Sequence, residues 1–296
     1  MSLASTNNAS THHLQSEECE PSKDLMNSAF IPPCPLQLQG KKGLILGVAN
    51  QRSIAWSCAE QLSLYGAELT LTVLDERAHK QASKLINTLP LSDQPHPPLI
   101  IECDVRSSED ISRLSTLISS HWGKLDFLIH SIAFAQLEDL KKPITECSTT
   151  GYLEAMEISA YSLLSTINAL KPLFSPQASI VTMSYLGSEV AIPSYGIMGP
   201  VKAALESQVR YLAAELGPQG IRVNALSAGP LKTLAASAIP GFRQQLKTSG
   251  ELTPLRRNIT HQEVAQTAVF LCSAMSSGIT GETLHVDAGR HAVREL

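Results

Sequence analysis

The chain has 296 residues, of which 43% are hydrophobic and 17% charged, with a formal net charge of -4. This composition indicates a globular protein with a sizeable core, since single α/β domains reach roughly 250 residues. The weakly acidic balance excludes a basic surface for nucleic acid or a membrane, and no apolar run approaches the ~18 residues of a membrane span. Because the amino terminus has neither a secretory signal nor an Arg-rich transit sequence, we expect a cytoplasmic protein.

The six cysteines and the first 39 residues carry no recognisable site. No two cysteines have CxxC spacing, so we interpret them as buried or incidental thiols and expect no metal. Residues 1–39 are rich in Ser, Asn, Thr and Pro and lack periodicity, which predicts a disordered tail, and we assign His12 and His13 to that solvated tail. A single dinucleotide-binding catalytic domain is expected over 40–296.

From Gly40 onward, short apolar runs alternate with helical stretches. The runs are expected to be strands, at 43–48, 68–73, 99–105, 127–133, 179–185, 221–227 and 283–289. Helices are expected at 53–65, 76–88, 107–121, 151–170 and 195–216. This alternation predicts an α/β, doubly wound (Rossmann-like) fold, a mostly parallel seven-stranded sheet with helices on both faces. Ligands of such sheets bind beyond the carboxyl ends of the strands.

The end of the first strand predicts a site for a dinucleotide pyrophosphate. Gly47 ends that strand, and Ser53 and Ile54 begin the next helix. Glycine permits close approach of a phosphate, and a helix N-terminus attracts an anion. The stretch is not GxGxxG, and an ordinary strand–loop–helix with Ser53 as the helix cap is an equally good interpretation.

Acidic and small residues follow the next three strands. Asp75 lies just past the second strand, where a carboxylate accepts from a ribose hydroxyl and repels a 2′-phosphate. It predicts NADH, with NADPH disfavoured, although Arg77 argues for NADPH. Asp104 and Val105 close the third strand, where Asp104 either contacts adenine or caps the following helix. Ile132 closes the fourth strand among small residues that let a cofactor lie close.

The candidate catalytic residues lie in the stretch SYLGSEVAIPSYGIMGPVKAAL, at 184–205. Tyr195 and Lys202 are expected on one helix, seven residues apart and on the same side. An ammonium near a phenol favours the phenolate, making Tyr195 a better donor to an oxygen that becomes negative during hydride transfer. Tyr185 adds a second phenol at the same sheet edge. Pro200 costs about 3 kcal/mol and kinks the helix if interior, and costs less in a first turn.

The strand–turn–helix order and the Tyr/Lys pair resemble the short-chain dehydrogenase/reductase superfamily. Most members have Tyr-x3-Lys, a pattern that fails here because position 199 is Gly. Tyr-x6-Lys, with an earlier tyrosine in SYLG, is similar instead to the NADH-dependent enoyl-acyl-carrier-protein reductases of type II fatty-acid synthesis. The similarity runs through GVANQRSIA, CDV, HSIAFA, RYLAAELGPQGIRVNALSAGP and GITGETLHVDAG and covers essentially all of 40–290.

This resemblance implies a reaction and residue roles. NADH would deliver hydride to the β-carbon of a trans-2-enoyl thioester held by acyl carrier protein, and Tyr195 would stabilise the enolate oxygen. Tyr185 would assist and line the substrate site, and Lys202 would bind the nicotinamide ribose. Ala135 would contact the acyl chain. The nicotinamide side would be contacted by Leu231, Lys232, Thr233, Leu234 and Ala235, and a helix over 234–248 would form a lid. A homotetramer is implied as well.

Two departures from the family keep other interpretations open. Pro200 interrupts the catalytic stretch, and the lid offers only Arg243 and Lys247 to an acidic carrier. These features motivate a diverged, non-catalytic or altered-specificity paralogue. A carbonyl-reducing short-chain dehydrogenase is the other alternative, and the missing Tyr-x3-Lys argues against it.

Overall fold

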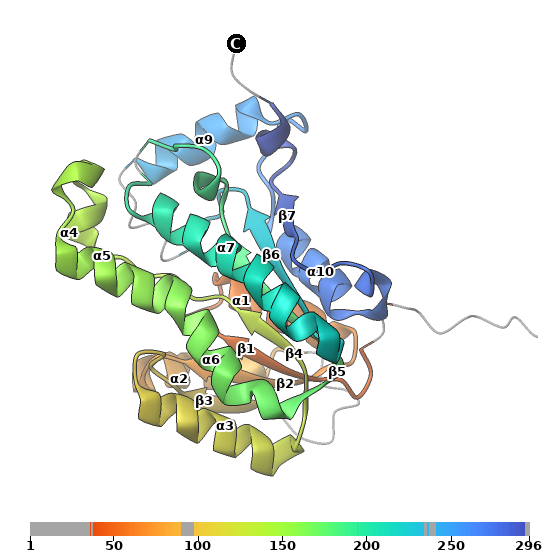
Figure 1. Ribbon diagram of the computed structural model, residues 1–296. Helices are drawn as coiled ribbons and strands as arrows, with labels where there is room; N and C mark the ends of the chain where they lie inside the picture. Colours follow the sequence, from red (N-terminus) through yellow and green to blue (C-terminus); the bar gives the residue numbers. More distant parts are fainter. Residues whose placement is uncertain are drawn as a thin grey trace, which may run out of the picture. The chain divides into compact units, whose positions relative to one another are not determined.

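Seven parallel strands form one sheet in the order β3-β2-β1-β4-β5-β6-β7 (Figure 1). The computed structural model describes residues 36, 38–89, 98–193, 195–233, 236 and 241–293, without the side chains of residues 243 and 245. The strands are β1 (Lys42–Leu46), β2 (Glu68–Val73), β3 (Leu99–Glu102), β4 (Leu125–His130), β5 (Phe174–Ser184), β6 (Arg222–Ala228) and β7 (Thr283–Val286). The predicted doubly wound fold is confirmed, and its order reverses between β1 and β4, where such folds bind ligands.

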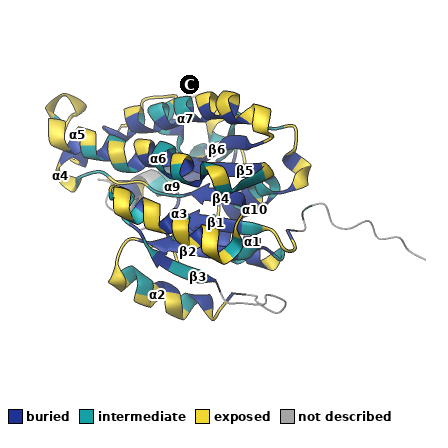
Figure 2. Cartoon of the chain, turned by 60° about the horizontal axis from the view of Figure 1, so that its bottom comes forward, coloured by how far each residue is buried: buried dark blue, intermediate teal, exposed yellow. Residues whose placement is uncertain are grey.

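Helices cover both faces of the sheet and form two separate hydrophobic clusters with it. Successive side chains of β1 alternate between them, because Leu44 and Leu46 join one cluster and Ile45 the other. The cluster of Ile45 includes α1 (Ile54–Leu64), α2 (Glu76–Ile86) and α10 (His261–Cys272). The cluster of Leu44 includes α3 (Ser108–Trp122), α5 (Thr149–Met156), α6 (Ser162–Leu170) and α7 (Met198–Leu216). Figure 2 shows the buried strands between helices whose outer faces are exposed.

The predicted helix over 151–170 is divided by a wider turn. It consists of α5, a π-helical turn η3 (Glu157–Tyr161) and α6. Two short elements precede it, α4 (Leu137–Leu140) and the 3-10 turn η2 (Ile144–Glu146). A π turn inserts an extra residue into a helix and is frequent at functional sites.

The chain joins the core before the expected boundary between residues 39 and 40. Leu38 is 2% exposed, and its backbone N–H donates to the carbonyl of Tyr65 at 2.8 Å. Leu36 packs against the same cluster. Apolar side chains within a Pro-rich stretch therefore belong to the folded unit, and the predicted boundary falls too late. The expectation of disorder over residues 1–35, including both histidines of the tail, lies outside the described residues.

The described cysteines are free thiols. Cys58 and Cys103 are buried, and burial raises the pKa of each to about 12. Cys147 and Cys272 are partly buried. In the described part of the chain, no helix is long and apolar enough to cross a membrane.

Candidate active site

A cavity of about 520 Å³ opens beyond the carboxyl ends of β1, β4, β5 and β6. Several predicted site residues line it together: Gly47, Ser53, Ile54, Ile132, Ala135, Tyr185, Tyr195, Lys202, Leu231 and Thr233. Asp75, Asp104, Val105 and Lys232 are absent from its lining, and Leu234 and Ala235 lie outside the described residues. The structure therefore brings the two expected ends of the site, for the pyrophosphate and for the chemistry, into one space.

Gly47 is fixed in a conformation that only glycine adopts readily. Its φ is +91°, and a Cβ there would lie 2.3 Å from the carbonyl oxygen of Ser131. The first strand therefore passes directly against the end of β4. Ser53 caps α1, because its hydroxyl accepts from Trp56 N at 3.1 Å and donates to Asn50 O at 2.8 Å. The free N–H groups of the first turn of α1 remain suited to an anion.

Asp75 serves as the cap of α2. Its Oδ1 accepts from the backbone N–H of Ala78 at 2.8 Å, and the side chain is exposed at the end of β2. Arg77 is exposed beside it. Both side chains are therefore accessible at the end of β2, where the adenosine ribose is expected. Asp75 favours NADH and Arg77 favours NADPH, and the structure leaves both interpretations open.

Asp104 pairs with a side chain that the sequence reading had not considered. Arg106 Nη2 donates to Asp104 Oδ2 at 2.7 Å, and these hydrogen bonds hold the pKa of that carboxyl below its usual value. The following helix is capped by Ser107, whose hydroxyl accepts from Asp110 N at 3.1 Å. The alternative in which Asp104 caps α3 is therefore wrong, and its contact with adenine stays a prediction.

The two phenols lie against each other in the lining of the cavity. The ring centroids of Tyr185 and Tyr195 are 4.6 Å apart with an interplanar angle of 63°. Gly187 makes this packing possible, since a Cβ there would lie 2.4 Å from Cδ1 of Tyr195. An edge-on aromatic pair of this kind holds both hydroxyl-bearing rings in place.

The catalytic helix begins later than predicted. α7 starts at Met198, so Tyr195 lies in the turn before it, and the expectation that it shares a helix with Lys202 is wrong. Pro200 is the third residue of α7, where a backbone N–H has no partner within the helix. The whole helix, from Met198 to Leu216, is 19 residues long and contains Lys202. Pro200 therefore does not interrupt the helix before Lys202, as an interior proline would. This removes one motive for a non-catalytic paralogue.

Lys202 lines the same cavity from a buried position. It is 4% exposed, and its Nζ donates to the carbonyl oxygen of Met183 at 2.7 Å. Burial lowers the pKa of Lys202 to about 8, and the negative charge of Glu206 opposes that fall. Desolvation of a charged group explains the direction.

The predicted acidification of Tyr195 is wrong. Burial raises the pKa of Tyr195 above its ordinary value, and the neighbouring Tyr185 and Glu206 add to the rise. The ammonium of Lys202 is directed to a main-chain carbonyl and does not offset desolvation. Tyr195 is therefore a neutral phenol, suited to donating a hydrogen bond to a developing negative charge.

Three buried polar residues near the site were missed by the sequence reading. His130 lies with Nδ1 2.9 Å from Thr182 Oγ1 and Nε2 2.8 Å from Ser162 Oγ, and burial lowers its pKa to about 3. Ser159, in the π turn, bonds both main-chain groups of Phe134, which lines the cavity. The third is Glu206; its position four residues after Lys202 was the available signal.

Of the lid segment, Ala236 and the residues from Gly241 onward are described, and Ala236 lines the cavity. There α9 (Phe242–Leu252) forms, and Phe242 lines the cavity. The observed helix extends to Leu252, four residues beyond the predicted end at 248. Residues 234, 235 and 237–240 of the predicted lid lie outside the described residues. Of its two basic residues, Lys247 belongs to α9, and the side chain of Arg243 is outside the description.

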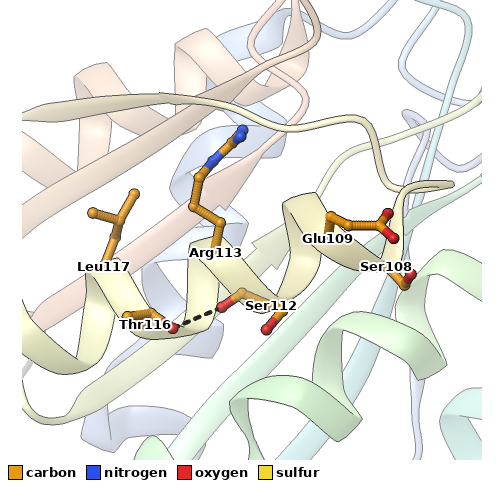
Figure 3. Close-up of a pocket in the computed structure, with 6 residues that line it drawn as sticks. All are labelled: Ser108, Glu109, Ser112, Arg113, Thr116 and Leu117. Atoms are coloured by element: carbon orange, nitrogen blue, oxygen red, sulfur yellow. Dashed lines mark hydrogen bonds between the residues drawn. The ribbon is translucent and has the colours of Figure 1, made fainter.

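A second hollow of about 630 Å³ lies on the outer face of α3 (Figure 3). All its lining residues come from that one helix: Ser108, Glu109, Ser112, Arg113, Thr116 and Leu117. The hydroxyl of Thr116 donates back to the carbonyl of Ser112 at 3.0 Å, within the helix. This hollow contains none of the predicted site residues, so the first cavity is the candidate active site.

Paired phenols and a buried lysine beside a cavity at the switch point of a doubly wound sheet are the arrangement of a nicotinamide-dependent reductase. A family model described as "Enoyl-(Acyl carrier protein) reductase" matches residues 47–291. The chain belongs to this family, and the resemblance seen in the sequence is confirmed.

Individual relatives agree across almost the whole chain. The enoyl-[acyl-carrier-protein] reductase [NADH] of Nostoc sp. is 47% identical over 86% of this chain and 97% of its own length. The [NADPH] enzyme of Staphylococcus aureus is 44% identical over 88% of this chain and 100% of its own. A crystal structure of the Aquifex aeolicus NADH enzyme has a TM-score of 0.83 at 41% identity, covering 88% of this chain and 100% of that one.

Proposed function

We propose that this protein reduces the carbon–carbon double bond of a trans-2-enoyl thioester carried by acyl carrier protein, with NADH as reductant. The observation that carries the proposal is the contact between Tyr185 and Tyr195 in a cavity that buried Lys202, Gly47 and Ser53 also line. A hydride acceptor and a dinucleotide can share such a space. Membership of the enoyl reductase family supports the same reaction.

The residues at the cavity fit a nicotinamide dinucleotide. The close approach of β1 and β4 at Gly47 and the capped N-terminus of α1 suit the pyrophosphate. Lys202 would hold the nicotinamide ribose, and Leu231 and Thr233 would line the nicotinamide side. When bound, the reduced nicotinamide supplies hydride to the β-carbon; with a proton from solvent added at the α-carbon, the double bond becomes a single bond.

Tyr195 is assigned the decisive chemical role. Negative charge moves to the thioester oxygen as the β-carbon is reduced, and a neutral phenol donates to that oxygen most strongly in the transition state. Tyr185 orients the ring of Tyr195 and lines the substrate side. Ala135 would contact the acyl chain, and the apolar ring of Phe242 would help exclude water from it.

NADH is the proposed reductant because of Asp75. Its exposed carboxylate at the end of β2 would accept from the adenosine ribose and repel a 2′-phosphate. Relatives named for NADH and for NADPH both match the chain, so the nicotinamide class is common to them and the choice between the two is specific to each.

We also propose a homotetramer in the cytoplasm that receives substrate from an acidic carrier. Exposed large side chains on the outer helices support an interface between subunits, among them Leu153 of α5, 61% exposed, and Tyr211 of α7, 77% exposed. Light scattering with size-exclusion chromatography tests the assembly, and cell fractionation tests the compartment.

Loss of reduced-nicotinamide absorbance tests the reaction directly. A trans-2-enoyl thioester is supplied as the coenzyme A and as the carrier-protein form, each with NADH and with NADPH. We expect turnover with NADH, and faster turnover with the carrier form. Reduction of a 3-oxoacyl thioester without reduction of the enoyl one would instead establish a carbonyl reductase. Tight NADH binding without any turnover would establish the non-catalytic paralogue.

A further inference from the structure

Glu206 is a buried carboxylate on α7, the helix that carries Lys202. It has no role in the reaction proposed for the site. It is 6% exposed and lies one helical turn after Lys202. The hydroxyls of Ser184 and Ser188 both contact its Oε1, the latter at 2.6 Å. Burying a charge is costly unless it is paired and hydrogen-bonded, and two hydroxyl donors suit the ionised form.

The two serines belong to the turn that carries Tyr185. Ser184 is the last residue of β5, directly before Tyr185, and Ser188 ends the 3-10 turn η5 (Leu186–Ser188). Ser188 Oγ also lies 2.9 Å from the carbonyl oxygen of Tyr185. Gly187, between them, packs against the ring of Tyr195. A single carboxylate on α7 thus fixes the turn against which both phenols rest.

The same carboxylate acts electrostatically on Lys202. Burial favours the neutral amine of Lys202, and the charge of Glu206 favours the ammonium. The other titratable groups around the lysine supply no negative charge: His130 of β4 is kept neutral by burial, and Tyr195 has a raised pKa. Tyr185 contributes a phenol from the end of β5.

We propose that Glu206 is a positioning residue for enoyl reduction, which holds the Ser184–Ser188 turn in place and keeps Lys202 in its ammonium form. This inference rests on the proposed function of the site. An ammonium is the form that donates hydrogen bonds from all three protons, so a neutral Lys202 would bind ribose hydroxyls less well. A purely structural carboxylate would affect folding and leave the titration of Lys202 alone.

The test separates the charge of Glu206 from its hydrogen bonds. Glu206→Gln keeps the shape and removes the charge, Glu206→Asp keeps the charge, and Ser188→Ala removes one hydrogen bond. Glu215→Gln, at an exposed position of α7 paired with Lys171, is the matched control. For each protein, the pKa of Lys202 is measured without ligands by carbon-13 NMR of labelled lysine, with Lys202→Arg identifying the signal. The pH profile of kcat with NADH and a carrier-bound enoyl thioester is measured in parallel.

We expect Lys202 in Glu206→Gln to titrate about one pH unit lower than in the wild type, because a nearby opposite charge favours the ammonium by an amount of this order. The fall of kcat at high pH should shift to lower pH by the same amount, because activity is lost as the pH rises through the pKa of Lys202. Glu206→Asp should restore the titration, and Glu215→Gln should not change it. Ser188→Ala should lower kcat severalfold. The pH at which kcat falls and the Kd for NADH should stay unchanged.

Equal lysine titrations in Glu206→Gln and Glu215→Gln would overturn the charge role. Wild-type kcat in Ser188→Ala would overturn the positioning role, and this variant decides that role even if Glu206→Gln does not fold. In Glu206→Asp, which keeps the charge, Lys202 should then still titrate as it does in the wild type. Absence of enoyl reduction by the wild type would contradict the proposed function alone, since the NMR titration needs neither substrate nor cofactor.

Discussion

The two ends of the proposed site use their polar side chains differently. At the end proposed for the nucleotide, Ser53 and Asp75 cap helices and Asp104 pairs with Arg106, although Asp75 and Asp104 lie outside the cavity lining. At the catalytic end, Lys202 and Glu206 are buried, and their contacts join α7 to β5. The nucleotide end thus presents mainly backbone and helix termini to a ligand, whereas the catalytic end depends on individual side chains. Substitutions should therefore affect binding at one end and chemistry at the other.

The largest expected effect is at the catalytic end. Tyr195→Phe removes the hydroxyl that we propose donates to the developing oxyanion, so kcat should fall by about 10²- to 10⁴-fold. The Kd for NADH should stay unchanged, because the ring still packs on Tyr185. Stopped-flow turnover and fluorescence titration measure both quantities. Tyr65→Phe, at the C-terminal end of α1 and outside the cavity lining, serves as the control, and retained turnover in Tyr195→Phe would contradict the assignment.

At the end proposed for the nucleotide, the sharpest test is a substitution of Gly47, because its backbone conformation matters more than any side chain there. Gly47→Ala should destabilise the fold by about 1–3 kcal/mol, because alanine is strained at positive φ and its Cβ meets Ser131. NADH affinity should fall as well. Gly278→Ala is the control, since nothing lies near a Cβ there. Urea unfolding measures the effect, and equal stability of the two variants would argue against a constrained Gly47.

The buried histidine of the catalytic end predicts a dependence of stability on acid. The pKa of His130 falls from 6.5 to about 3 on folding, so below pH 6.5 the unfolded chain binds a proton that the folded chain does not. Stability should therefore decrease as pH falls, with a contribution of about 2 kcal/mol between pH 7 and pH 5. Urea unfolding of His130→Gln should lose this part of the pH slope, while His121→Gln, at an exposed position, should keep it.

The smallest expected effect concerns the choice of cofactor. Asp75→Asn retains a helix cap and removes the charge, so stability should stay within about 0.5 kcal/mol of wild type while the preference for NADH weakens. Asp75→Ala should additionally lose about 1 kcal/mol of stability with the cap. Thermal unfolding and kcat/KM with both cofactors measure these effects. An unchanged NADH preference in Asp75→Asn would mean that residues other than Asp75 select the cofactor.

The sequence predicted the elements better than it predicted what individual polar residues do. Every predicted strand exists, because a buried parallel strand is apolar over its own short length. The start of α7 was misplaced, since Tyr195 in a turn and Tyr195 in a helix give the same letter pattern. The contact of Ser159 in the π turn depends on Phe134, 25 residues away in the chain, which no local pattern records. The partner of Asp104 is local, because Arg106 follows two residues later, but the sequence analysis did not consider that pair.

The sequence by itself determined the sheet, the strand ends that Gly47 and Tyr185 follow, and the family to which the chain belongs. These follow from periodicity, from turn residues and from motifs, all of which are local in the chain. Only the tertiary structure decided that Tyr195 is a neutral phenol and that Glu206 lies buried beside Lys202. The physical reason is that desolvation and charge act through space, so the ionisation of a side chain depends on everything packed around it.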